Sequence, residues 1–173
     1  MASALKNLSE FDESKLPSGE EFKIGIVVSD YHHEITFALY EACYDTLIKY
    51  GVKADHIHTE QVPGAFELPV GAKLLAGRQS LDAVICLGCV IKGETPHNNY
   101  INQAVASALT HMGIASGKPF VYGVLTPNTL DQAKARAGGA HGNKGVEAAV
   151  TALRMIGLKK EKYESAHRIG FSS

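Results

Sequence analysis

The chain has 173 residues, and its 17 Lys and Arg against 18 Asp and Glu give a formal net charge of −1. This length suits one domain that can bury a core without a disulfide or metal, and the near-neutral charge differs from the basic surface of a nucleic-acid-binding protein. The sequence favours a cytoplasmic protein with no membrane segment, because its apolar runs are short, its N-terminus lacks a signal-peptide core and it has only three cysteines.

The predicted elements alternate between strands and helices. Polar residues 1–21 are expected to form a loose N-terminal arm. Apolar, β-branched runs predict strands at residues 22–28, 56–62, 81–88 and 120–126. Helical periodicity and glycine stops predict helices at residues 34–50, 66–76, 95–112, 129–137 and 143–156, with Thr95 as the cap of the third.

This alternation predicts an α/β fold: a three-layer αβα sandwich with a four-stranded, mainly parallel sheet, in one domain over residues 22–158. Residues 159–173 are expected to form a polar C-terminal tail. In such sheets, ligands bind beyond the carboxyl ends of the strands. Residues 29–33, 63–67, 89–97 and 125–128 should therefore meet at one edge.

The turn GETPH at residues 93–97 leads into a predicted helix. Free amides and the positive dipole end at a helix start suit a phosphate or carboxylate. His97 in this first turn is a candidate for proton transfer near neutral pH. An ordinary turn with a surface histidine explains the same residues.

Arg136 and Lys144 flank a glycine-rich segment, and two cations near a helix start could form an anion site. A flexible glycine linker with solvated cations is the alternative. Glu67 either complements a helix dipole or accepts a hydrogen bond from a ligand ring. Tyr31 and Phe66 could face such a ring, or belong to the core.

The cysteines Cys86 and Cys89 match C-x-x-C, but they lie on or just past a strand, where positions three apart point to opposite faces. A redox dithiol is therefore not expected. The histidines lack the accompanying carboxylates or thiolates of a zinc site, so no metal is predicted.

Three blocks together resemble the 6,7-dimethyl-8-ribityllumazine synthase family of riboflavin biosynthesis. They are VPGAFELP at residues 62–69, LGCVIKGETPH at residues 87–97, and RAGG with GNKG at residues 136–139 and 142–145. The resemblance implies a flavodoxin-like fold. It also implies condensation of 5-amino-6-(D-ribitylamino)uracil with 3,4-dihydroxy-2-butanone 4-phosphate, through an imine, phosphate loss and ring closure, without a cofactor or metal. A non-catalytic lumazine- or flavin-binding shell protein of the same fold is the alternative.

The resemblance also implies roles for the matching residues. His97 corresponds to the proton donor, Arg136 to the ion-pair partner of the phosphate, and Glu94 and Thr95 to the helix start that holds this phosphate. The other matching positions bind the substrates, and they are Tyr31, Ala65, Phe66, Glu67, Cys89, Val90, Ile91, Tyr122 and Lys144.

Some positions depart from the family pattern. Asn98 and Asn99 stand where an aromatic residue and an aspartate are frequent, and Tyr31 and Tyr122 stand where Phe, or Trp at the first, is usual. None removes a named catalytic role, so we expect activity with an altered pH dependence or substrate affinity.

The family assembles as homopentamers, often twelve to an icosahedral 60-mer. The resemblance places Tyr122, Arg136 and Lys144 in the active site of the adjacent subunit, and the compact segment 138–145 resembles that of shell-forming members. We therefore expect a pentamer or a 60-mer of pentamers whose N-terminal arm docks on a neighbour. The expected partners are other copies of the chain and small-molecule substrates, without nucleic acid or membrane.

Overall fold

Four parallel strands form the central sheet of the computed structural model, which describes residues 9–168 and, among them, the side chains of residues 9–162. The strand order is β2-β1-β3-β4, and each neighbouring pair is parallel. The strands are β1 (Ile24–Ser29), β2 (Ile57–Val62), β3 (Ala83–Cys89) and β4 (Phe120–Leu125). The predicted four-stranded parallel sheet is confirmed.

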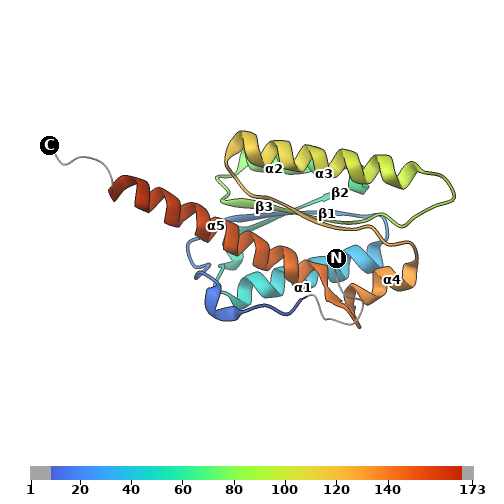
Figure 1. Cartoon of the computed structure of the whole chain (residues 1–173), viewed down its shortest axis with the longest axis horizontal. Helices are drawn as coiled ribbons and strands as arrows, with labels where there is room; N and C mark the ends of the chain where they lie inside the picture. The colour runs from blue at the N-terminus through green and yellow to red at the C-terminus, as the bar shows by residue number, and fades with distance from the viewer. Residues whose placement is uncertain (1–8, 169–173) are drawn as a thin grey trace.

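Helices cover both faces of this sheet (Figure 1). On one face lie α2 (Leu68–Arg78) and α3 (His97–Ser116). On the other lie α1 (His33–Lys49), α4 (Leu130–Ala135) and α5 (Lys144–Arg168). The predicted three-layer sandwich is therefore confirmed. None of the helices within residues 9–168 is long and apolar enough to span a membrane.

The two central strands, β1 and β3, are buried at every position. Their apolar runs are continuous because helices cover both sides of the sheet. Ile26 and its neighbour Val27 point to opposite faces: Ile26 belongs to the core that includes Leu39 of α1, and Val27 to the core that includes Leu68 of α2. The buried central strands thus support the loops at the carboxyl edge of the sheet.

The glycine-rich segment contains a hairpin that the sequence does not predict. Strand β5 (Ala137–Gly139) pairs antiparallel with β6 (Gly142–Asn143). Gly138 and Gly142 have φ angles of 107° and 82°, a region that glycine enters without strain. Helix α5 also differs, because it continues to Arg168 instead of ending near residue 156. The apolar spacing stops at Ile156, whereas the Lys and Glu residues that follow are good helix formers.

The N-terminal arm contacts the domain from Ser9 onward. Leu16 packs against the core on the side of the sheet that α1 and α5 cover. Phe11 contacts the Tyr50 ring edge-on at a centroid distance of 5.9 Å, and the Gly19 N–H donates to the Tyr50 carbonyl over 2.9 Å. Residues 1–8 of the arm and residues 169–173 of the predicted tail lie outside the described residues.

Candidate active site

Backbone hydrogen bonds join, in pairs, the segments that follow the four strands. The Tyr31 N–H donates to the Pro63 carbonyl over 3.1 Å, and the Val90 N–H donates to the Leu125 carbonyl over 2.8 Å. The chains leaving β1 and β2 therefore continue side by side, as do those leaving β3 and β4. Because β1 also pairs with β3, all four predicted segments meet at one edge of the sheet.

A pocket of about 340 Å³ opens at this edge, and we call it the strand-end pocket. It is bounded by the loops after β1, β2 and β3 and by the first turns of α3. Its lining includes these predicted site residues: Tyr31, Ala65, Cys89, Val90, Ile91, Thr95 and His97. The topology of the sheet alone predicts that these residues lie together at this edge.

Two exposed aromatic residues lie at the ends of β1 and β2. Tyr31 is 67% exposed and Phe66 is 59% exposed. The Tyr31 ring lies across Gly64, where an added Cβ would come within 2.9 Å of Tyr31 Cδ2. The Glu67 carboxylate accepts the Gly64 N–H through Oε2 over 3.1 Å, so it stabilises the loop that carries Phe66. Exposed rings of this kind can stack on a planar ligand.

Helix α3 begins at His97, and the N-cap position belongs to Pro96. The prediction that Thr95 caps this helix is wrong, because the helix begins one residue later and Pro96 takes the N-cap position. The proline side chain has no oxygen that could accept a hydrogen bond from a first-turn amide. No side-chain cap hydrogen bond is present at this N-terminus. The amides of His97 and Asn98 and the positive dipole end are therefore available beside the exposed residues Glu94 and Thr95. The Asn99 N–H donates to the Pro96 carbonyl over 3.0 Å.

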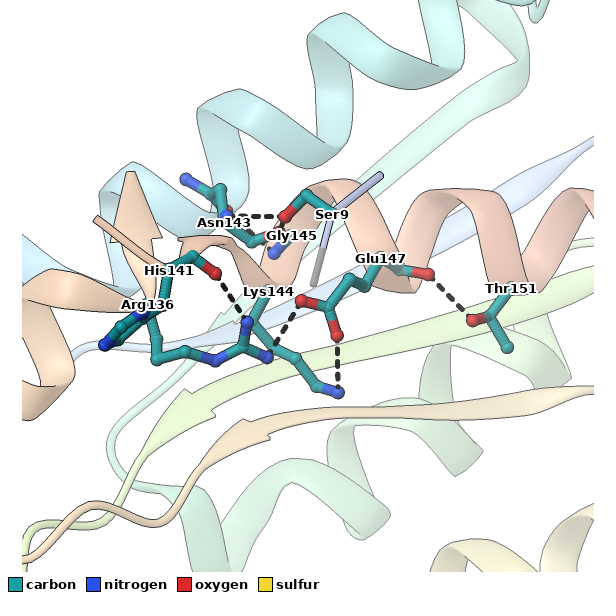
Figure 2. A network of polar contacts seen from close by, with 8 residues as sticks. All are labelled: Ser9, Arg136, His141, Asn143, Lys144, Gly145, Glu147 and Thr151. Atoms are coloured by element: carbon teal, nitrogen blue, oxygen red, sulfur yellow. Dashed lines mark hydrogen bonds and ion pairs between the residues drawn. The ribbon is translucent and has the colours of Figure 1, made fainter. Parts of the chain in front are cut away.

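The predicted cations form a cluster with a carboxylate, which we call the cation cluster: Arg136, Lys144 and Glu147 (Figure 2). Arg136 Nη2 lies 2.8 Å from Glu147 Oε1, and Lys144 Nζ donates to Glu147 Oε2 over 3.1 Å. Arg136 Nη1 also donates to the His141 carbonyl over 2.8 Å. The three side chains are only 19%, 28% and 18% exposed in that order, so the hairpin and α5 hold both cations in place.

Asn143 fixes the start of α5 and with it the position of this cluster. Its Oδ1 accepts the Gly145 N–H over 2.7 Å, and its Nδ2 donates to the Ala38 carbonyl of α1 over 3.1 Å. The Ser9 hydroxyl of the arm bonds both backbone groups of Asn143, as donor over 3.1 Å and as acceptor over 2.7 Å. Gly145 is required at this crossing, because a Cβ there would overlap the Leu39 carbonyl oxygen.

The cation cluster borders a second hollow of about 610 Å³, the edge groove, which runs along the edge strand β4 between α3 and α5. Its lining includes Ile114, Phe120, Tyr122, Lys144, Glu147 and Met155. Burial raises the pKa of the Tyr122 phenol above its ordinary value. Within the described chain, Tyr122 and Lys144 thus lie at the edge groove and not at the strand-end pocket.

A sequence model described as 6,7-dimethyl-8-ribityllumazine synthase matches residues 21–160. The chain belongs to this family. It is 48% identical over 160 residues to the 6,7-dimethyl-8-ribityllumazine synthase of Porphyromonas gingivalis, a match that covers 92% of this chain and 99% of the relative. The protein of the same name from Parabacteroides distasonis is 48% identical over 156 residues, covering 90% and 98%. That of Cytophaga hutchinsonii is 47% identical over 156 residues, with the same coverage.

This result confirms the resemblance to the lumazine synthase family and favours the enzyme over the non-catalytic alternative. The matched range includes both the strand-end pocket and the cation cluster. Glu147 is the residue of this region that sequence reasoning missed. Its signal was available: a carboxylate three residues after Lys144, in the first turn of a helix.

The cysteines take no part in a dithiol. Cys86 belongs to the core under α2 and α3, and Cys89 to the core on the opposite face, as the strand geometry predicts. Burial raises the pKa of Cys86 to about 12 and that of Cys89 to about 11. Between residues 9 and 168, no cluster of three or more His, Cys, Asp or Glu residues is suited to hold a metal ion.

Proposed function

We propose that this protein condenses 5-amino-6-(D-ribitylamino)uracil with 3,4-dihydroxy-2-butanone 4-phosphate to 6,7-dimethyl-8-ribityllumazine, releasing phosphate and water, in the penultimate step of riboflavin biosynthesis. One observation carries this proposal: His97 and the uncapped start of α3 lie in the same pocket as the backbone of residues 89–91 and Tyr31. A proton-transfer group, an anion-binding helix end and an aromatic face are thus combined in one pocket.

In the proposed mechanism, the pyrimidine lies along residues 89–91 and stacks on Tyr31, while Phe66 and Glu67 hold its ribityl chain. The pyrimidine amino group attacks the ketone and forms an imine with loss of water. Loss of a C–H proton beside the imine then drives cleavage of the C–O bond to phosphate, and the electron pair of that bond leaves with the phosphate. The ribitylamino nitrogen finally attacks the remaining carbonyl carbon and closes the ring with loss of a second water. His97 donates and accepts the protons, the usual role of a histidine in general acid–base catalysis.

The leaving phosphate is a dianion and needs positive partners in a fixed place. The α3 start, beside Glu94 and Thr95, supplies backbone N–H groups and the dipole. Arg136 supplies a guanidinium that can bind two phosphate oxygens. Holding both reactants in this geometry contributes up to about 7–11 kcal/mol to lowering the barrier.

We further propose that the active site is completed between copies of the chain in a homopentamer, or in a 60-mer of pentamers. The division of the predicted residues supports this, because Tyr122 and Lys144 line the edge groove while His97 lines the strand-end pocket. A neighbour that docks its edge groove beside the strand-end pocket would bring the two sets together. Exposed apolar residues of the groove, Ile114 at 78% and Met155 at 43%, suit such contact. All three cysteines are free and buried, which supports a cytoplasmic location.

The purified protein is mixed with both substrates, and lumazine absorbance and free phosphate are followed together. We expect equal amounts of both products, formed well above the uncatalysed rate. A rate equal to that without protein would refute the enzymatic function and favour the alternative, a non-catalytic binding protein. Native mass measurement tests the assembly, and a monomer would contradict the shared site.

A further inference from the structure

We propose that Glu147 is a positioning residue that acts as a counter-charge: it limits how tightly Arg136 and Lys144 hold phosphate, so that the released phosphate can leave. The proposal rests on the phosphate role proposed above for Arg136. Glu147 contacts both cations through different oxygens, Oε1 toward Arg136 at 2.8 Å and Oε2 toward Lys144 at 3.1 Å (Figure 2). One carboxylate therefore reduces the charge of two cations to a net +1.

The contact with Arg136 is an ion pair and not a hydrogen bond. Glu147 Oε1 is buried and accepts no hydrogen bond from the described part of the chain, although Arg136 Nη2 lies 2.8 Å away. The oxygen is close enough for charge attraction but lies out of line with the N–H bonds. Glu147 therefore offsets the guanidinium charge without accepting a hydrogen bond from it. Nη1 donates to the His141 carbonyl, and the other N–H groups of Arg136 are those that can bind phosphate oxygens.

Partial burial makes this charge effect large. Glu147 is 18% exposed and Arg136 is 19% exposed, so water and salt screen the pair less than they screen surface charges. Two unopposed cations in such a place would hold a dianion strongly, and a strongly held product slows turnover. We expect removal of the Glu147 charge to tighten phosphate binding on the order of tenfold.

The test is titration calorimetry with inorganic phosphate on the assembled wild type, E147Q, E147D, R136A and E41Q. E147Q keeps the shape of the side chain without its charge, and we expect phosphate binding about tenfold tighter together with stronger product inhibition. E147D keeps the charge, so its affinity should stay close to that of the wild type. Glu41 is exposed on α1, and E41Q controls for a change in total charge. If E147Q fails to assemble, the phosphate affinity of E147A, measured in the same way, tests the proposal.

Each outcome has a separate meaning. Equal or weaker phosphate binding by E147Q overturns the counter-charge proposal, and weaker binding by both E147Q and E147D assigns Glu147 to holding the cations in place. Wild-type affinity in R136A would instead refute the phosphate role of Arg136. Thermal melting followed by circular dichroism identifies a purely structural role of Glu147. If its carboxylate only stabilises the first turn of α5, E147Q lowers the melting temperature without tightening phosphate binding.

Discussion

Replacing Gly145 by alanine tests the packing that places the cation cluster. Gly145 is buried near the start of α5, and a methyl group there would overlap the Leu39 carbonyl oxygen and lie 2.8 Å from the carbonyl carbon. This oxygen belongs to the backbone of α1, and the Leu39 side chain is fully buried, so neither can yield without moving the helix. We expect G145A to lower the free energy of unfolding by about 3 kcal/mol, the upper end of the usual overpacking cost.

Thermal unfolding followed by circular dichroism at matched protein concentration measures this loss. For a chain of this size, 1 kcal/mol corresponds to roughly 2–4 °C, so G145A should melt about 6–12 °C below the wild type. G77A is the matched control, because Gly77 is also helical and nothing lies within 4 Å of its Cβ position. Its melting temperature should stay level or rise slightly. A G145A protein that melts within about 2 °C of the wild type would refute the reasoning.

Three further predictions concern the site and the core. R136A should raise the KM for the phosphate substrate roughly 10- to 100-fold in steady-state kinetics, because a charge-assisted pair worth about 1.5–3 kcal/mol is lost; an unchanged KM would remove Arg136 from the phosphate role. H97A should lower kcat by about 10²-fold or less, since water partly replaces a general acid, and a wild-type rate would show that His97 is not the proton donor. Burial raises the pKa of Cys86 to about 12 and that of Cys89 to about 11 from 9.0, so the folded state binds these protons more tightly than the unfolded state. Their contribution to stability is complete below pH 9.0 and is lost as the pH rises to about 11 for Cys89 and about 12 for Cys86. Urea midpoints should fall over this range, less steeply in C86A, and an equal slope in both proteins would contradict the assignment.

The central strands and the strand-end pocket are the parts that the sequence predicts well. β1 and β3 are buried on both faces, so their apolar runs are unbroken, and parallel strands bring their carboxyl ends to one edge. The positions of Tyr31, Ala65 and His97 then follow from topology alone.

Local turns and side-chain pairing are harder to predict. The β5–β6 hairpin rests on the positive φ angles of Gly138 and Gly142, which leave no alternating pattern to detect. Thr95 has the residue type of a cap, but the following proline takes that place. Glu147 reads as an ordinary first-turn carboxylate until the hairpin brings Arg136 against it. The pairing of β5 with β6 and the contact between Arg136 and Glu147 join separate segments, and single-segment patterns do not encode them.

Mixing two inactive variants tests the central claim, an active site that joins His97 of one subunit to Arg136 of another. H97A and R136A are unfolded together, refolded as a 1:1 mixture, and assayed for lumazine at substrate concentrations far below the KM of R136A. Random assembly leaves about one site in four with both native residues, so the mixture should recover about a quarter of wild-type activity. Activity equal to the average of the two separate variants would contradict the shared site.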